Sequence, residues 1–308
     1  MTFPDRLNDG SLAPPRLRRD INLGTLLALP PGSAGYCTSL DAQLALIKAD
    51  GYTAVQHWNQ FDEIQRAGLR ATGMARITSP SQADEVARAH RDAGVEATTL
   101  HLGTSFESEA EADQLVDAVL EAAARHGHAM YIETHRATLT QDIWRTLQLV
   151  ERFPDMRFNA DLSHWYAGHE LTYGGEFAER AARLEPVLNR TRFMHARIAN
   201  SGAIQVRAGE AGPATGHFRW LWNRCFRGFL AGARPGDVLS FNAELLPARI
   251  GEGADAMWLH YAPTLPHEPE DPLRGEPGDR YRDAMDLWSI ASEEFAAARD
   301  AMGASASI

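Results

Sequence analysis

Several features that would point to other kinds of protein are scarce in this 308-residue chain. Its two cysteines, Cys37 and Cys225, cannot build a disulfide framework or a thiolate-rich zinc site, so a reducing cytoplasm is the expected location. Positive charge is also in short supply: 30 Lys and Arg face 41 Asp and Glu, a formal net charge of -11. Binding to nucleic acid through the phosphate backbone is therefore not expected. No apolar run approaches the roughly 18 residues of a membrane-spanning helix, so no membrane association is expected either.

A basic segment near the N-terminus has two interpretations. Residues 16–19 contain three arginines and precede the apolar run 21–30, which superficially resembles a secretion signal. The polar stretch before that run is long for a signal. We therefore expect residues 1–20 to form an N-terminal arm and residues 21–28 to form the first strand of a single domain covering 21–308.

Strand-like and helical patterns alternate along the rest of the chain. Hydrophobic residues make up 44% and charged residues 23%, as in one compact globular domain. The predicted strands are residues 21–28, 53–57, 72–76, 95–101, 129–133, 158–161, 192–198 and 238–244. The predicted helices are residues 41–50, 61–68, 81–94, 107–126, 141–153, 177–188, 218–230 and 281–299. Eight alternations predict an α/β protein with a single (β/α)8 TIM barrel.

Two connections are longer than this repeat requires. Residues 199–217 follow the seventh predicted strand and are rich in glycine and alanine, and residues 262–280 follow the eighth and contain five prolines. Both are βα loops, which lie at the face where barrel enzymes hold their active sites. The second loop is either a lid or subunit contact, or simply a solvated connection.

Four predicted strands run into a side chain that can bind a metal: Glu133, Asp161, His195 and Glu244. The intervals from 133 to 161, from 161 to 195 and from 195 to 244 are 28, 34 and 49 residues, the lengths of successive strand–helix units. Such side chains meet only if the strands form a parallel barrel. Three carboxylates and one imidazole suit one divalent ion, with Mn2+ favoured and Mg2+, Co2+ or Zn2+ also compatible.

Two further residues lie beside these candidate ligands. His164 follows Asp161 by three residues and is expected either to bind or protonate a substrate oxygen, or to donate a hydrogen bond to that aspartate. Arg197 follows His195 by two residues and therefore points to the same face of the strand. It is expected either to neutralise a developing oxyanion or to pair with a ligand carboxylate.

Other side chains at strand ends are candidates for the substrate pocket. His101 and His57 end the fourth and second predicted strands, and a core histidine is the slightly favoured alternative for His57. Trp165 would stack on a sugar ring or serve only for packing. His135 shares the site-facing parity of the first carboxylate, and Arg136 is expected to lie at the surface.

The order Glu, Asp-x-x-His, His and Glu at successive strand ends resembles the xylose isomerase-like TIM barrels. The likeness covers about residues 21–299, and the segments 133–136, 161–165 and 195–197 are similar to bacterial proteins called sugar phosphate isomerase/epimerase. The resemblance implies a metal-dependent sugar isomerase or epimerase. In that chemistry Glu133 and Glu244 hold the ion and move a proton at the carbon beside a carbonyl, through a metal-bound enediolate, with His164 assisting.

The resemblance leaves other activities open. A lyase or dehydratase would use the same proton abstraction and then eliminate a β-substituent from a keto-sugar or a 3-keto-glycoside, with His164 or His101 as the acid. A non-catalytic sugar-binding barrel is a third reading. A nuclease of the AP endonuclease type is disfavoured by the acidic net charge and because residues 200–206 lack its Asp-x-His pair.

Departures from the epimerase pattern limit what the sequence says of the substrate. Ser201 occupies the place of an arginine that sugar 3-epimerases usually have, so Arg197 or Arg207 would have to substitute for it. The expected partner is a small sugar or keto-sugar. No glycine-rich phosphate cradle is evident, which favours a substrate without phosphate. A homo-oligomer is compatible with the sequence.

Overall fold

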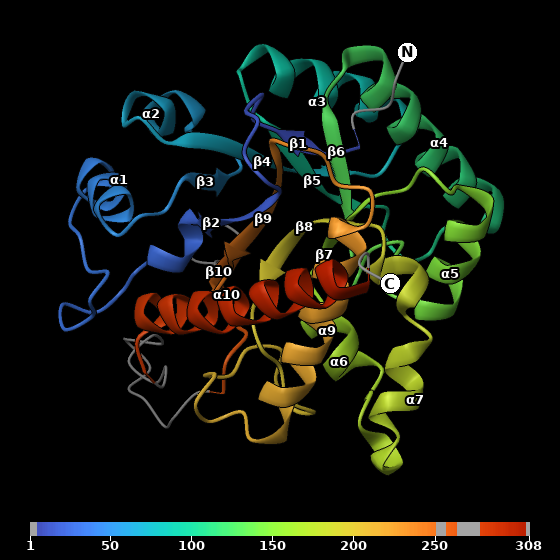
Figure 1. The fold of residues 1–308 in the computed structure, drawn as a ribbon. Coiled ribbons are helices and arrows are strands. Elements are labelled where there is room, and N and C mark those ends of the chain that lie inside the picture. Colours follow the sequence, from blue (N-terminus) through green and yellow to red (C-terminus); the bar gives the residue numbers. More distant parts are fainter. Residues whose placement is uncertain (1–4, 251–256, 264–277, 306–308) are drawn as a thin grey trace.

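The computed structural model describes residues 5–250, 257–263 and 278–305 (Figure 1). At its centre, eight parallel strands form a closed ring, because β9 pairs with both β8 and β2. The predicted single (β/α)8 barrel is thereby confirmed. The barrel strands are β2 (Arg16–Asn22), β3 (Ala54–His57), β4 (Arg70–Ile77), β5 (Ala97–Leu102), β6 (Ala129–Glu133), β7 (Phe158–Ala160), β8 (Thr191–Ala196) and β9 (Asp237–Ala243).

Helices surround this ring (Figure 1). The main ones are α1 (Leu40–Ala49), α2 (Phe61–Arg66), α3 (Pro80–Asp92), α4 (Glu109–His126), α5 (Ile143–Arg152), α7 (Phe177–Ala182), α8 (Glu185–Leu188), α9 (Pro213–Leu230) and α10 (Arg280–Ser305). Their ends follow local chemistry. Ser108 and Glu111 form a capping box at the start of α4, and Gly127 ends that helix with a φ of 62°. Helix α3 begins at Pro80, with Ser79 as its N-cap residue, one residue before the start predicted at 81.

The first barrel strand starts earlier than predicted. Strand β2 covers Arg16–Asn22 instead of residues 21–28, so the expected boundary of the arm at residue 20 falls inside it, and Leu23–Leu26 form a 3-10 helix, η1. The basic residues that suggested an arm are accommodated by pairing. Arg18 is buried and bonds to Asp20 and Glu96. Buried charges with partners of this kind are compatible with a barrel strand.

Smaller elements were not anticipated from the sequence. They are β1 (Leu7–Asn8), which pairs antiparallel with β9, the short helix α6 (Ser163–Gly168), the 3-10 helix η2 (Tyr173–Gly175), and an antiparallel hairpin of β10 (Pro247–Ile250) and β11 (Met257–His260). The loop at 199–217 carries one isolated bridge, between Ile198 and Val206. Most of the expected loop at 262–280 lies outside the described residues.

The core leaves one end of the barrel available for a site. A large apolar cluster packs the helices against the strands, and a smaller one lies at the amino ends of the strands, where Leu7 of β1 joins Tyr131, Phe193 and Val238. The carboxyl ends of the parallel strands are the opposite end, where barrel loops build functional sites. Among the described residues, no helix is both long and apolar enough to cross a membrane.

Candidate metal centre

Glu133, Asp161, His195 and Glu244 converge at the carboxyl ends of the barrel strands. Each offers one ligand atom, and the four atoms lie within 4.8 Å of one another. Glu133 is the last residue of β6, His195 lies near the end of β8, and the other two immediately follow β7 and β9. All four side chains are buried. The structure therefore brings together the four residues that the sequence singled out.

The imidazole of His195 is oriented by an amide at its far side. Its Nε2 donates to Oε1 of Gln56 at 2.7 Å, and this oxygen also accepts from Asn22 and Asn242. When the ring is neutral, as it must be to bind a metal, the lone pair is therefore on Nδ1, which lies 3.3 Å from both Glu133 Oε1 and Glu244 Oε2 without a hydrogen bond. Metal-ligating histidines usually donate their second N–H in this way.

Without an ion, His195 carries the positive charge among these carboxylates. Burial lowers its pKa, but Glu133 and Glu244 raise it more, and the resulting pKa is about 9. Burial also raises the pKa of Glu133, yet the neighbouring His195 and His101 overcome this and hold that pKa well below its usual value. The positive charge of the imidazolium thus compensates the carboxylates in the way that a bound metal ion would.

The two glutamates differ in how their oxygens are used. Both carboxylate oxygens of Glu244 accept hydrogen bonds: Oε1 from Asn22 at 3.0 Å and Oε2 from Arg197 at 2.7 Å. Burial raises its pKa, partly offset by His195 and Arg197. Glu133 Oε2 accepts from Asn159 at 3.2 Å, whereas its Oε1 is buried without a hydrogen bond. An orphaned carboxylate oxygen of this kind is expected at a site that binds a cation.

Asp161 is held by a buried network. Its Oδ2 accepts two hydrogen bonds from Arg197, the one from Nε at 2.9 Å, and its Oδ1 accepts from the backbone of Ser163 at 3.1 Å. His164 Nε2 lies 3.4 Å from Oδ2. Burial raises the pKa of Asp161, but Arg197 and His164 lower it far below the usual value. Arg197 therefore pairs with carboxylates of the cluster, the second of the two roles expected for it.

The donor set fits a divalent cation. The three carboxylates carry more negative charge than the one guanidinium, Arg197, can neutralise. Two atoms that lack hydrogen bonds, Glu133 Oε1 and His195 Nδ1, lie 3.3 Å apart. Oxygen ligands with one imidazole are the set that Mn2+, Mg2+ and Co2+ accept, and zinc is also compatible. The residues present therefore fit the single divalent ion expected from the sequence.

Three histidine rings form a row beside the carboxylates. The ring centroids of His101 and His135 are 4.3 Å apart, and those of His135 and His164 are 4.0 Å apart. His101 Nε2 lies 3.3 Å from Glu133 Oε2. Burial lowers the pKa of His135 to about 2, and its Nδ1 bonds to the carbonyl oxygen of Arg136. His101 and His164 thus lie where a pocket role is feasible, and His135, outside the principal predictions, lies between them.

Two other expected pocket residues are placed differently. Trp165 is 1% exposed and its Nε1 donates to the carbonyl oxygen of Thr140 at 2.8 Å, so it packs inside the protein instead of offering a stacking face. The ring of His57 is half-buried and bonds to the backbone of Asn59. Because side chains alternate along a strand, Gln56 points into the barrel in its place.

The sequence pattern did not point to a layer of buried amide side chains beneath the cluster. Within this layer Gln56 donates a hydrogen bond to Thr99, and other amides donate to the two glutamates. The members are Asn22, Gln56, Asn159 and Asn242. Their inward parity could have been deduced from strand alternation, but amides lack the charge that drew attention to the acids and histidines.

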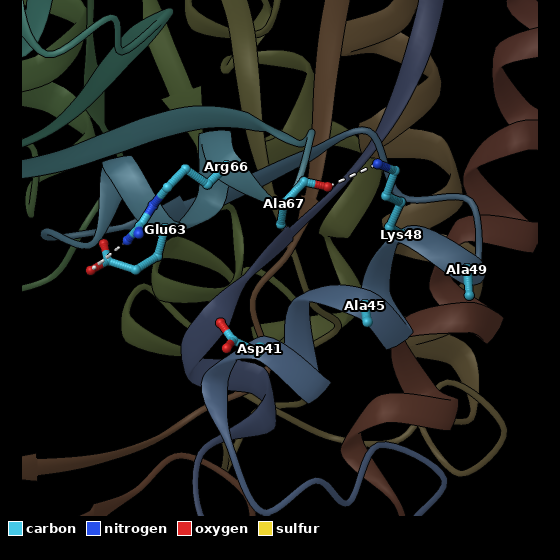
Figure 2. Close-up of a pocket in the computed structure, with 7 residues that line it drawn as sticks. All are labelled: Asp41, Ala45, Lys48, Ala49, Glu63, Arg66 and Ala67. Carbon is cyan, nitrogen blue, oxygen red and sulfur yellow. Dashed lines mark hydrogen bonds and ion pairs between the residues drawn. The ribbon is translucent and has the colours of Figure 1, made fainter.

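A cavity of about 560 Å³ opens beside this centre, lined by His164, by Arg136, by the loop at 200–204 and by Tyr261–Pro263. A second hollow, of about 690 Å³, lies between α1 and α2 on the outside of the barrel (Figure 2). There Lys48 donates to the carbonyl of Ala67, and Arg66 pairs with Glu63. Only the first hollow adjoins the metal-capable residues.

Comparison with known proteins finds solved structures with a similar fold. No protein-family model and no curated protein matches the sequence. A xylose isomerase domain protein from Planctomyces limnophilus is 15% identical with a TM-score of 0.51, over 93% of this chain and 99% of that chain. A sugar phosphate isomerase/epimerase from Parabacteroides distasonis is 13% identical with a TM-score of 0.50, over 90% and 96%.

A third solved structure, a xylose isomerase-like TIM barrel protein from Mycobacterium smegmatis in complex with magnesium, is 12% identical with a TM-score of 0.48, over 97% of this chain and 100% of that chain. Identities this low speak for architecture alone. The resemblance stated from the sequence is confirmed at that level: this chain has the fold of the xylose isomerase-like TIM barrels.

Proposed function

We propose that the protein is a divalent-metal-dependent sugar isomerase or epimerase that removes a proton from the carbon next to a carbonyl. One observation carries the proposal: three carboxylates and a correctly oriented imidazole present four ligand atoms within 4.8 Å at the carboxyl end of the barrel. Glu133, Asp161, His195 and Glu244 would hold the ion, with Mn2+ as the favoured metal. When bound, the ion supplies a Lewis acid that polarises the substrate carbonyl and acidifies the neighbouring C–H.

Glu133 is the carboxylate best prepared to take the proton. Its Oε1 has no hydrogen bond, and in the ion-free protein its pKa is raised by burial but lowered more by His195 and His101, so it is ionised there. Glu244 is held at both oxygens by Asn22 and Arg197 and would return a proton from its own side of the carbon. Two carboxylates of unequal basicity suit a reaction that needs one base and one acid.

Arg197 and His164 would act on the oxygen of the substrate. Arg197 is fixed by Asp161 and Glu244, and its remaining NH1 is buried without a hydrogen-bond partner. His164 Nδ1 is likewise buried and unpartnered, and burial lowers the pKa of this histidine so that it stays neutral. The Arg197 nitrogen would stabilise negative charge that develops on the substrate oxygen. Because Nε2 of His164 faces Asp161, its Nδ1 in the neutral ring would orient the substrate by accepting a hydrogen bond from a hydroxyl.

The second candidate function is a lyase or dehydratase. It begins with the same proton abstraction and ends with loss of a β-substituent from a keto-sugar or 3-keto-glycoside. The observation that favours it is the row of His101, His135 and His164, which places further imidazoles beside the carboxylates. His164 or His101 would protonate the leaving group.

The test uses Mn2+-loaded protein and a panel of ketoses, keto-sugars and 3-keto-glycosides in deuterated water, followed by NMR. Deuterium entering the carbon beside the carbonyl without loss of a group is expected for the isomerase or epimerase. Release of water or an aglycone would establish the lyase instead. Glu133→Gln should abolish either reaction while leaving the thermal unfolding temperature within a few degrees. Turnover that is independent of added Mn2+, or undiminished in this variant, would refute the mechanism.

A further inference from the structure

A charged residue that lines the cavity has no role in the proposed metal centre. Two of the side chains that line the cavity of about 560 Å³ are His164, which is buried, and Arg136, which is exposed. Among the described residues that line the cavity, Arg136 alone has a permanent charge. No carboxylate of the described part of the chain pairs with it, whereas Arg197 bonds to two. The Arg136 guanidinium lies over the ring of Tyr261, 5.5 Å from its centroid.

The loop that carries Arg136 is held rigidly. Ala137, the next residue, has a φ of 59°, a left-handed conformation that a residue with a side chain adopts only at a cost of roughly 1 kcal/mol or more. Hydrogen bonds hold the loop in place: Thr138 Oγ1 to His135 O, His135 N to Thr140 Oγ1, Ala137 N to Gln141 Oε1, and Trp165 Nε1 to Thr140 O. The backbone on both sides of Arg136 is therefore fixed, while its side chain is exposed.

Residues 200–204 also line the cavity. There the side chain of Asn200 accepts from the backbone N–H groups of Gly202 and Ala203, and Ser201 is exposed. Burial raises the pKa of Tyr261, so its hydroxyl keeps its proton. The described lining therefore combines one cation with neutral hydroxyls and contains no acid.

The metal centre itself would not repel an anion. Its three carboxylates contribute three negative charges, Arg197 contributes one positive charge, and a divalent ion would contribute two. These charges sum to zero when His195 and His164 are neutral. The chain as a whole carries -11, so an anionic substrate needs a local cation to be held.

We propose that the cavity is a subsite for a carboxylate, so that the substrate is an acidic sugar, with Arg136 binding the carboxylate while the carbonyl end lies at the metal centre. This inference rests on the proposed function and narrows its substrate class. A guanidinium binds a carboxylate through two parallel N–H···O bonds, and a single arginine matches one negative charge better than a phosphate dianion. Arg136 is here a specificity-determining residue and takes no part in moving the proton.

The test compares D-glucuronate with D-glucose, which differ by a carboxylate in place of a hydroxymethyl group. Each is titrated calorimetrically into Mn2+-loaded protein. The wild-type protein should bind D-glucuronate roughly tenfold or more tightly than D-glucose. Arg136→Met should remove this preference while leaving the weaker D-glucose affinity as it was, and Arg136→Lys should keep part of it. The matched control is Arg66→Met on α2, outside the cavity, which should behave as wild type.

Three outcomes would overturn the subsite: equal D-glucuronate affinity in wild type and Arg136→Met, tighter Arg136-dependent binding of D-glucose 6-phosphate than of D-glucuronate, or no binding of any of the three sugars. Titration of Mn2+ alone into the same proteins separates this failure from failure of the proposed function. Normal Mn2+ binding with no carboxylate preference would reject only the subsite, whereas loss of Mn2+ binding would reject the metal centre.

Discussion

The amide oxygen of Gln56 lies 2.7 Å from Nε2 of His195 and fixes which nitrogen of that ring can bind a metal. An amide oxygen can only accept hydrogen bonds, as it also does from Asn22 and Asn242, so Nε2 of His195 must be the donor. Nδ1 consequently faces Glu133 and Glu244. A residue on the second barrel strand thereby controls a ligand on the seventh.

Gln56→Leu should weaken metal binding. The substitution keeps the approximate side-chain volume but removes the acceptor that orients His195, so Mn2+ affinity should fall about 10- to 100-fold, as is usual when the partner of a metal-bound histidine is lost. Isothermal titration calorimetry with Mn2+ measures this. Gln65→Leu, on the outer helix α2, is the control. If both variants bind Mn2+ equally well, the orientation of His195 does not limit affinity.

Metal binding should become stronger as the pH rises. In the ion-free protein the pKa of His195 is about 9, because Glu133 and Glu244 outweigh the effect of burial. Below that pH an incoming ion must displace the proton, so the Mn2+ dissociation constant should fall about tenfold per pH unit between pH 7 and 9. Calorimetry in buffers of different ionisation enthalpy should show release of about one proton. An affinity that does not change over this range would contradict the assignment of Nδ1.

Loss of Arg197 should destabilise the protein more than loss of an exposed arginine. Arg197→Met leaves Asp161 and Glu244 as buried carboxylates without their cation, which typically costs about 3–5 kcal/mol in free energy of unfolding. Urea denaturation of the ion-free protein measures it, and added Mn2+ should restore part of the loss. Arg183→Met removes an exposed partner of Glu179 and should change little. Similar stability of the two variants would show that the ion pairs of Arg197 with Asp161 and Glu244 make no net contribution to the free energy of unfolding.

Acid should destabilise the fold through His128, which is away from the metal centre. Burial lowers its pKa to about 4, and its Nε2 shares a hydrogen bond of 2.7 Å with Thr98. The unfolded chain therefore takes up a proton near pH 6.5 while the folded protein resists it. The contribution to stability is complete above pH 6.5 and decreases as the pH falls to 4, by about 3 kcal/mol.

Urea unfolding curves from pH 7.5 down to 4 check this expectation. His128→Gln retains a polar side chain but cannot titrate, so its stability should decline less steeply over the same range. The same slope in both proteins would assign the acid sensitivity to other groups, including His90, whose pKa burial also lowers.

Much of the architecture follows from local sequence. Alternating apolar runs and helix signals such as the stop at Gly127 identify the βα repeat, because hydrogen bonding and apolar burial within each unit depend on neighbouring residues. The repeat then places acidic and histidine side chains at the same end of parallel strands. For this reason the four candidate ligands could be predicted from the sequence.

Tertiary structure alone decided what surrounds them. Residues 16–20 looked like a basic arm, yet Arg18 finds partners at Asp20 and Glu96, the latter distant in the sequence, so these residues join the barrel. The roles of Trp165 and Arg197 likewise depend on contacts with Thr140 and Glu244, which local patterns do not encode. Closure of the barrel brings these residues into contact. It also gives Glu133 and Glu244 their different hydrogen-bond partners.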